Sequence, residues 1–193
     1  MRLFAGIPLD DATRAYVTTA VEVLKRDGVQ ARWVPAENWH ITLAFLGEVA
    51  DAALPAVTSA FRTMSVRGQA SLAQKQIAPF ALRLSCVGAF PNDRRPRVIW
   101  VGDRDESASF STAALAVRGA FLPLGFRFND EARAHVTIGR SNGAAALRPS
   151  TLAPAISMPV TRLALFESVR RPGGVRYVER EVVTLDSDVV IED

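Results

Sequence analysis

The chain has 193 residues, 49% of them hydrophobic, which suits one globular domain and excludes an intrinsically disordered protein. No apolar run reaches the ~18 residues of a membrane span, and residues 1–16 lack the long apolar region of a signal peptide. We therefore expect a single domain over residues 1–193, monomeric and cytoplasmic, with no membrane partner.

Arginine makes up 21 of the 23 basic residues, and the formal net charge is +3 with a pI of about 9.6. Its planar guanidinium binds phosphate bidentately, which suits a nucleic acid or nucleotide partner. A genome-wide bias from lysine to arginine explains the composition equally well, so charge alone selects no function. The single cysteine, Cys86, excludes an internal disulfide framework, and its apolar surroundings predict a core residue.

The first half of the chain predicts strands at residues 2–9, 31–34 and 38–47, each bounded by turn or capping residues. Two amphipathic helices separate or follow them. Asp10 or Asp11 caps the first, which ends at Gly28. Their apolar faces are Val17, Ala20, Val21 and Leu24 in the first helix, and Leu54, Val57, Phe61 and Met64 in the second. Residues 67–77 show no clear period.

The second half predicts strands at 80–85, 97–102 and 133–140, and loops at 88–96 and 143–154. A third helix, capped by Ser107 or Ser109 and stopped by Gly125, has an apolar face of Phe110, Ala113, Ala114, Val117, Phe121 and Leu124. A Pro-Gly-Gly turn joins strands 160–169 and 175–185 into a hairpin. This mixed order predicts an α+β fold with mostly antiparallel sheet.

Both histidines of the chain occur in the same four-residue pattern, His-x-Thr-x with apolar residues at x. His40 lies in "NWHITLAFLG" and His135 lies in "RAHVTIGRSN", 95 residues later. This separation is about half the chain and suggests a duplicated lobe.

On a strand, alternate side chains share a face, so His40 and Thr42 point one way while Ile41 and Leu43 point the other. By the same alternation, His135 and Thr137 share one face of their strand, and Val136 and Ile138 share the other. Imidazole and hydroxyl then lie about 6.6 Å apart along each strand. One half-buried histidine is more often structural than catalytic. The repetition of the whole pattern is what favours a functional site.

Two histidines and two hydroxyls suit general acid–base catalysis at phosphorus. No Asp, Glu or Cys lies at metal-ligand spacing near either motif, and a nucleophile-elbow serine is absent from the sequence. Near neutral pH, one imidazole can be neutral and the other charged, so they can serve as base and acid. Threonine hydroxyls can donate hydrogen bonds to the non-bridging phosphoryl oxygens. We therefore expect no metal and no cofactor.

The paired motifs resemble those of the 2H phosphoesterase superfamily. The segments "MRLFAGIPL", "WHITLAFLGEV", "GAFPNDRRPRVIWVG", "HVTIGR" and "LFESVRRPGGVRYVE" together resemble its bacterial RNA 2',3'-cyclic phosphodiesterases, also described as 2'-5' RNA ligase-like proteins. The similarity runs from Met1 to about Glu179. It implies two pseudo-symmetric lobes of mostly antiparallel sheet, with outer helices and an active-site cleft between the lobes.

The resemblance also implies an activity: metal-independent hydrolysis of RNA 2',3'-cyclic phosphate ends to 2'-phosphomonoesters, with possible reversal as 2'-5' ligation. His40 corresponds to the acid that protonates the leaving 3'-oxygen, and His135 to the base that activates water. Thr42 and Thr137 correspond to phosphate-binding residues, as does Arg140, five residues after His135.

The residues leave several questions open. The motif is symmetric, so it does not assign acid and base by itself. A small cyclic nucleotide or ADP-ribose cyclic phosphate is an alternative substrate, and a nucleotide or RNA-end binding module without turnover is an alternative function. Other residues are candidates for RNA contacts. The arginines suit an ordinary solvated loop at least as well as a phosphate contact: Arg94, Arg95, Arg97, Arg170 and Arg171. The aromatic residues could stack on a base, but their strand positions favour the core: Trp33, Trp39, Phe45 and Tyr177.

Overall fold

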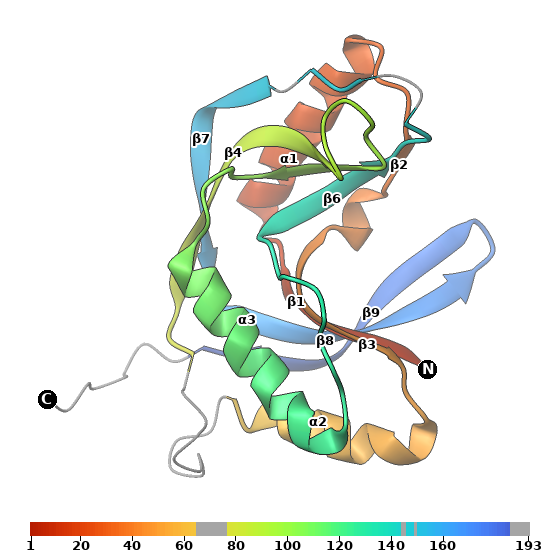
Figure 1. The fold of residues 1–193 in the computed structure, drawn as a ribbon, viewed down its shortest axis with the longest axis vertical. Coiled ribbons are helices and arrows are strands. Elements are labelled where there is room, and N and C mark those ends of the chain that lie inside the picture. Colours follow the sequence, from red (N-terminus) through yellow and green to blue (C-terminus); the bar gives the residue numbers. More distant parts are fainter. Residues whose placement is uncertain (65–76, 144–145, 149, 186–193) are drawn as a thin grey trace, which may run out of the picture.

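The computed structural model describes residues 1–64, 77–143, 146–148 and 150–185, and its strands form one nine-stranded antiparallel sheet (Figure 1). Eight strands follow the order β7-β4-β5-β6-β3-β1-β8-β9, and β2 pairs with β6 beside this path. The strands are β1 (Arg2–Pro8), β2 (Arg32–Trp33), β3 (His40–Glu48), β4 (Phe80–Phe90), β5 (Val98–Gly102), β6 (His135–Arg140), β7 (Ser150–Val160), β8 (Arg162–Arg171) and β9 (Gly174–Thr184). The predicted α+β class with antiparallel sheet is confirmed.

The described ranges contain three α-helices, each at a predicted place: α1 (Asp11–Arg26), α2 (Leu54–Arg62) and α3 (Ala108–Phe121). Asp10 caps α1 by accepting a hydrogen bond from the Thr13 backbone N–H, and Ser107 caps α3 through the Phe110 N–H. Short 3-10 turns are η1 (Ala36–Asn38), η2 (Asp51–Ala53) and η3 (Leu122–Leu124). None of the described helices is long and apolar enough to cross a membrane.

The two motif strands, β3 and β6, are neighbours in the middle of the strand path. They meet at one paired position, Ile41 opposite Val136. All other pairings join strands on one side of this junction, either within β7-β4-β5-β6 with β2, or within β3-β1-β8-β9. The junction therefore places the two histidine motifs side by side, although they are far apart in the sequence.

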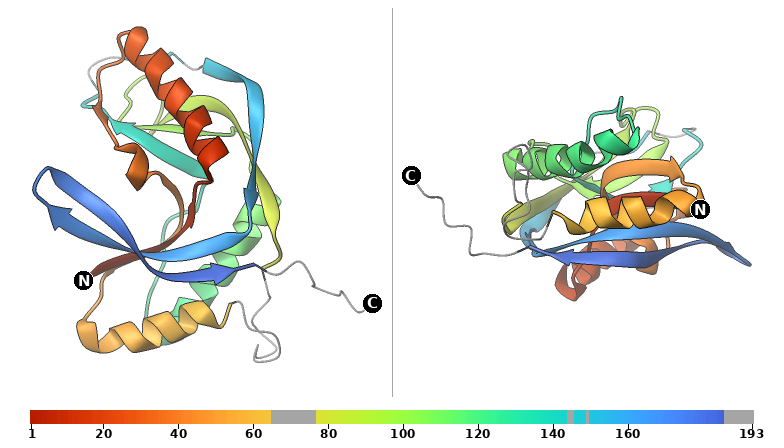
Figure 2. Two further views of the ribbon diagram at one scale, coloured as in Figure 1. Left: turned by 180° about the vertical axis from the view of Figure 1, so that it is seen from behind. Right: turned by 90° about the horizontal axis from the view of Figure 1, so that it is seen from below.

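The core lies on the sheet face opposite the histidines. Ile41, Leu43, Val136 and Ile138 are fully buried there, in one cluster with the apolar faces of all three helices. Helix α1 contacts β7, α3 contacts β3 and β4, and α2 contacts α3 and β9, so α1 and α2 lie at opposite ends of the molecule (Figure 2). The other face, which carries His40, Thr42, His135 and Thr137, is called the histidine face below.

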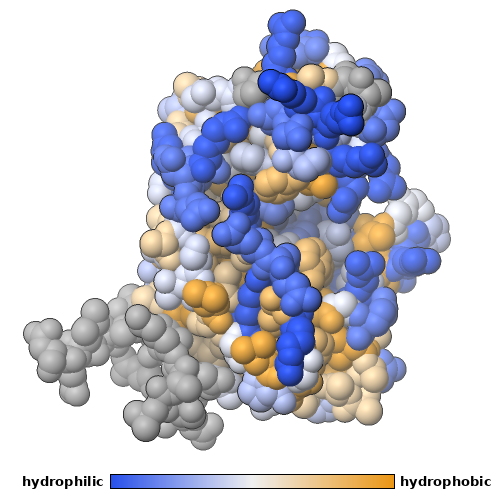
Figure 3. Space-filling view, viewed as in Figure 1, coloured by the Kyte–Doolittle hydropathy of each residue, from blue (hydrophilic) through white to orange (hydrophobic). Residues whose placement is uncertain are grey.

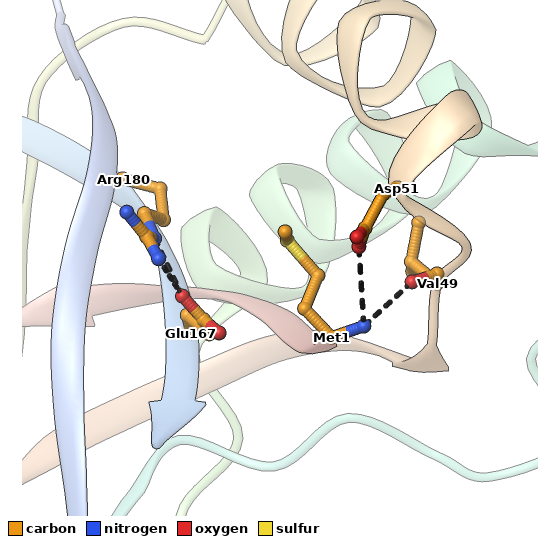
Figure 4. A network of polar contacts seen from close by, with 5 residues as sticks. All are labelled: Met1, Val49, Asp51, Glu167 and Arg180. Carbon is orange, nitrogen blue, oxygen red and sulfur yellow. Dashed lines mark hydrogen bonds and ion pairs between the residues drawn. The ribbon is translucent and has the colours of Figure 1, made fainter.

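Polar contacts fix the edges of the half that contains β1 (Figure 4). The Met1 ammonium donates a hydrogen bond to the Val49 carbonyl at 2.8 Å and lies 3.9 Å from Asp51. Across the β8–β9 pair, the Nε of Arg180 donates to Glu167 at 2.6 Å. These contacts join the start of β1 to the end of β3, and β8 to β9.

Three sequence predictions were wrong. Part of the predicted loop 88–96 is strand, because β4 continues to Phe90, and part of the loop 143–154 belongs to β7. The sequence did not indicate β7, because it contains two prolines, Pro154 and Pro159, which are rare inside strands. The prolines are tolerated because β7 is an edge strand, which pairs with β4 alone. Leu124, expected in the core, is 41% exposed in η3. Most of the segment 67–77 lies outside the described residues. Cys86 is buried and free, as predicted.

Substitution of Gly88 should destabilise the fold. A Cβ at this position in β4 would lie 2.3 Å from the ring of Trp100, which packs on the glycine from β5. We expect Gly88→Ala to lower the free energy of unfolding by about 1–3 kcal/mol, the usual cost of overpacking, measured by urea denaturation. Gly119→Ala is the control: it lies within α3 with no atom within 4 Å of a new Cβ. There alanine should stabilise by about 0.5–1 kcal/mol. Equal stabilities for wild type and Gly88→Ala would contradict the close packing.

Candidate functional site

The two motifs have the same local environment. The burial pattern is identical over six residues from each histidine: half-buried histidine, buried apolar residue, half-buried threonine, two buried residues and one exposed residue. Thr42 pairs with Gly6 of β1, and Thr137 pairs with Trp100 of β5. The structure therefore brings His40, Thr42, His135 and Thr137 onto one face of two adjacent strands.

A β-bulge follows each threonine. In β3 the register passes from Thr42 to Ala44, and in β6 from Thr137 to Gly139, each against consecutive residues of the partner strand. Leu43 and Ile138 are thus the extra residues. After a bulge the alternation of side chains resumes one residue late.

The bulges decide where the fifth residue after each histidine lies. Phe45 pairs with Phe4, and Arg140 pairs with Val98, two residues before Trp100. Both therefore lie on the histidine face, whereas strict alternation would have turned them into the core. Phe45 is 57% exposed, and Arg140 is exposed as well. Arg140 therefore lies on the same face as both histidines, and its predicted phosphate contact stays a prediction.

The carbonyl groups of both bulge residues have hydrogen-bond partners. The Nε of Arg118, on α3, donates to the Leu43 carbonyl at 3.0 Å. The backbone N–H of Val34 donates to the Ile138 carbonyl at 2.9 Å. Arg118 also donates to the backbone and side chain of Asp130, in the segment that leads to β6. The bulges are therefore built into the fold by specific donors.

Each histidine is oriented by a backbone carbonyl two residues earlier. Nδ1 of His40 lies 2.8 Å from the Asn38 carbonyl, and Nδ1 of His135 lies 2.8 Å from the Arg133 carbonyl. A carbonyl only accepts hydrogen bonds, so each Nδ1 carries the proton. Nε2 is then the nitrogen that gains or loses a proton in both rings.

Aromatic rings surround the imidazoles. His40 contacts Phe4 (ring centroids 4.6 Å apart), Tyr177 (4.9 Å, edge-on) and Phe166 (5.6 Å). Phe4, Phe166 and Ala164 form a small buried cluster separate from the main core, with Tyr177 packed against it. His135 contacts Phe90 edge-on at 4.9 Å.

This packing favours neutral imidazoles. Burial lowers the pKa of His40 to about 4; the hydrogen bond to the Asn38 carbonyl opposes this shift, and the charge of His135 adds to it. Burial also lowers the pKa of His135, with its bond to the Arg133 carbonyl opposing and the Arg133 charge adding. In the ligand-free protein burial therefore favours the neutral form of both rings at pH 7.

Asn38, not singled out from the sequence, connects the site to the β8–β9 hairpin. Its side-chain amide donates to the Val175 carbonyl at 2.7 Å and accepts from the Tyr177 backbone N–H at 3.0 Å. The residue is 6% exposed. Its backbone orients His40 while its side chain holds the strand that presents Tyr177 to the same ring. A buried asparagine two residues before a motif histidine was the available signal.

A cavity of about 180 Å³ flanks His135. Phe90, Trp100 and His135 line it together with residues 103–107 and the start of α3. Figure 3, drawn in the orientation of Figure 1, shows a recess near the centre of the molecule. In Figure 1 that place lies between β6 above and β9 and β3 below.

The other sequence candidates divide into core and surface. Trp39 is 5% exposed, and Trp33 is partly buried against the main core, which leaves neither ring free to stack on a base. The arginines considered for RNA contacts are all exposed: Arg94, Arg95, Arg97, Arg170 and Arg171. Among the residues that the structure describes, no group of three or more His, Cys, Asp or Glu could hold a metal ion.

Comparison with known proteins gives consistent matches. The family described as LigT like Phosphoesterase matches residues 7–100, which include His40 and Thr42. A protein of Archaeoglobus fulgidus named RNA 2',3'-cyclic phosphodiesterase is 37% identical over 141 residues, covering 72% of each chain. A protein of Methanothermobacter thermautotrophicus with the same name is 30% identical over 194 residues, covering 96% of this chain and 99% of its own. The second match includes both motifs.

Solved structures share the fold over nearly the whole chain. A Thermus thermophilus protein superposes with a TM-score of 0.79 at 26% identity, covering 97% of this chain and all of its own. The structure of E. coli LigT complexed with 3'-AMP has a TM-score of 0.74 at 25% identity, with 95% and 97% covered.

Replacing Asn38 tests its connection to His40. Asn38→Ala keeps the backbone carbonyl but removes both side-chain bonds to β9. We expect the free energy of unfolding to fall by about 1–3 kcal/mol, because two partly buried hydrogen bonds are lost, each contributing about 0.5–1.5 kcal/mol. The pKa of His40 should rise toward its ordinary value as Tyr177 loosens, measured by NMR titration of the ring protons.

The titration of His135 serves as the internal control and should not change. Asn129→Ala, at an exposed position, should shift stability by less than about 0.5 kcal/mol. If Asn38→Ala leaves both the stability and the His40 titration unchanged, the side chain has no such role.

Proposed function

The chain belongs to the LigT-like phosphoesterase family and is a phosphodiesterase, and we propose that it opens the 2',3'-cyclic phosphate at RNA ends to a 2'-phosphomonoester. The observation that carries this proposal is the placement of two Nε2 atoms and two threonines on one face of adjacent strands. The activity in the names of its relatives supports the same reaction.

We further propose that the molecule is one domain of two pseudo-symmetric lobes, with the histidine face lining the cleft between them. The division of the strand path at the β3–β6 junction supports this arrangement. So do the two bulges at equivalent positions, after Thr42 and after Thr137. A duplicated unit explains both features at once.

In the proposed reaction, water attacks phosphorus on the His135 side while the bond to the 3'-oxygen breaks on the His40 side. Nε2 of His135 takes a proton from the water as the new P–O bond forms. Nε2–H of His40 gives its proton to the departing 3'-oxygen. Thr42 and Thr137 donate hydrogen bonds to the non-bridging oxygens, where charge gathers. The cavity beside His135 gives the attacking water room to approach.

The low pKa of His40 fits the acid role once substrate is bound. The cyclic phosphate is an anion, and an opposite charge within about 4–6 Å favours the protonated imidazole. Arg140 then shares in neutralising the phosphate. A histidinium held among Phe4, Phe166 and Tyr177 gives up its proton readily, because burial disfavours its charge. In the ligand-free protein His40 has to gain this proton as the substrate binds.

The same pair can run the reaction with an alcohol in place of water. If a 5'-hydroxyl attacks on the His135 side, the product is a 2'-5' linkage. The reverse cleavage exchanges the roles of the histidines, so His135 acts as the acid. No step in either direction calls for a metal ion.

The proposed activity can be tested with an oligoribonucleotide that ends in a 2',3'-cyclic phosphate. In the presence of excess chelator, the protein should convert it to a 2'-phosphate end, identified by chromatography against 2'- and 3'-phosphate standards. His40→Ala and His135→Ala should each lower the rate about 10²–10⁴-fold, the usual contribution of one acid or base. Thr42→Ala and Thr137→Ala should cost less, about 1–3 kcal/mol for one hydrogen bond to a charged group.

Ser157→Ala, at an exposed position on the edge strand β7, is the control and should keep the wild-type rate. Near-wild-type turnover in either histidine variant would refute the two-histidine mechanism. Loss of activity with chelator, restored by a divalent metal, would refute the metal-free reaction. Conversion of a cyclic mononucleotide or ADP-ribose cyclic phosphate, with no conversion of the oligonucleotide, would instead support the small-molecule alternative.

The pH dependence should reflect the lowered pKa values. The active pair holds one proton, and kcat/KM reports the free enzyme, in which both pKa values lie below the usual 6.5. The optimum of kcat/KM should therefore lie below about pH 6.5, and the two apparent pKa values belong to the pair and not to either residue. Above the optimum, kcat/KM should fall about tenfold per pH unit as the last proton leaves. A kcat/KM that rises from pH 6 to pH 8 would contradict the burial of the two rings.

A further inference from the structure

Arg32 lies directly beside the site, although it precedes both motifs in the sequence. Strand β2 pairs with the end of β6, and Arg32 is the residue opposite Arg140. Directly opposed residues of an antiparallel pair point to the same face. Because the bulge turns Arg140 onto the histidine face, Arg32 lies on that face too. Its neighbour Trp33 points the other way and packs near Gly139.

The two arginines form a pair of like charges that costs energy. Both are exposed, and neither has an ion pair or a side-chain hydrogen bond among the residues that the structure describes. Like charges placed directly opposite on a sheet are destabilising. Many other arginines of the chain do have a carboxylate partner: Arg62, Arg83, Arg104, Arg118, Arg133, Arg162 and Arg180. The Arg32–Arg140 pair therefore lacks the anion that would balance it.

A phosphate group fits this pair best. Each guanidinium offers a planar fork of donors that matches two phosphate oxygens. Thr137 and Arg140 lie three residues apart on one strand, roughly 7–10 Å, and Arg32 lies one strand further out. The backbone separation of Thr137 and Arg32 therefore includes, beyond that of Thr137 and Arg140, the spacing of one strand, about 4.8 Å across the sheet. It is of the order of the step from one phosphate to the next along an extended RNA strand.

We propose that Arg32 binds the phosphate next to the cyclic phosphate, on the 5' side of the terminal nucleoside. This subsite rests on the proposed function, and Arg140 lies between it and the scissile phosphate. A 2',3'-cyclic mononucleotide has one phosphate and cannot fill the subsite. Arg32 is thus a specificity-determining residue that favours RNA ends over cyclic mononucleotides.

The test compares two substrates, the dinucleotide cyclic phosphate ApA>p and the mononucleotide A>p. Wild type should prefer the dinucleotide in kcat/KM. Arg32→Gln should lower that preference about 10–100-fold, the usual loss for one hydrogen-bonded contact to a charged group. The salt dependence of log kcat/KM for ApA>p should become shallower by about 0.7, the value for one phosphate contact on a single strand. Arg32→Lys keeps the positive charge but lacks the planar fork of donors. Its preference for ApA>p should therefore lie between that of wild type and that of Arg32→Gln.

Two further variants separate Arg32 from a general effect of charge. Arg140→Gln should lower kcat/KM for both substrates and leave their ratio close to that of wild type. Arg26→Gln, at the exposed end of α1, should change neither substrate. The Tm of Arg32→Gln should be no lower than the Tm of wild type, because the substitution removes a pair of like charges.

A third substrate, pA>p, has the 5'-phosphate of the terminal nucleoside but lacks the second nucleoside of ApA>p. It therefore shows whether the subsite recognises the phosphate or the nucleoside. If its 5'-phosphate restores the preference that ApA>p shows, the phosphate is the recognised group, as proposed. ADP-ribose cyclic phosphate, in a parallel assay, distinguishes a diphosphate from the RNA strand: a preference for it above ApA>p that depends on Arg32 overturns the assignment to RNA.

Failure of the subsite can be told apart from failure of the proposed function. If wild type opens both cyclic substrates but Arg32→Gln keeps the wild-type ratio, the subsite is wrong and the activity stands. If wild type opens neither, the proposed function itself is wrong.

Discussion

The site depends on one bulge in each motif strand, at Leu43 in β3 and at Ile138 in β6. If Leu43 and Ile138 were paired in regular register, strict alternation would direct Phe45 and Arg140 toward the helices. Burying the Arg140 guanidinium in that core without a partner would cost several kcal/mol. With the bulges, each strand keeps an unbroken apolar face and still presents an imidazole, a hydroxyl and a third side chain on the other. The guanidinium of Arg118 and the N–H of Val34 hold the bulges in place.

The second constraint is the balance between burial and charge at the histidines. Aromatic rings from β1, β8 and β9 fix the ring of His40, and the same rings disfavour its protonated form. An anion on the histidine face reverses that preference. In the reaction we propose, the acid therefore forms only when the substrate binds, and the positive charge of Arg140 and Arg32 draws the anion to the neighbouring strand end.

The sequence was sufficient to predict the two motif strands and the face that each histidine shares with its threonine, because His-x-Thr-x shows the alternation directly. The chemistry that it suggests stays a prediction. The sequence could not reveal the bulges, since an extra residue is defined only against the register of β1 and β5. The odd interval between His135 and Arg140 was the one hint, as strict alternation would separate their faces. Strand β7 was not predicted, because Pro154 and Pro159 are rare inside strands. A strand can accommodate them at the edge of a sheet, and the edge position of β7 is not visible in the sequence. The rings around His40 come from segments up to 137 residues away, as the Asn38–Val175 bond illustrates.

Main-chain carbonyls, rather than carboxylates, hold both imidazoles in their working tautomer. A carbonyl belongs to the backbone and persists through any amino-acid exchange, so genetic drift at position 133 can alter size and charge beside His135 without erasing the orienting acceptor. Enzymes that orient a histidine with an aspartate lose that acceptor in a single codon change. In this fold the side chains beside His40 and His135 can therefore change while the orientation of both imidazole rings is kept.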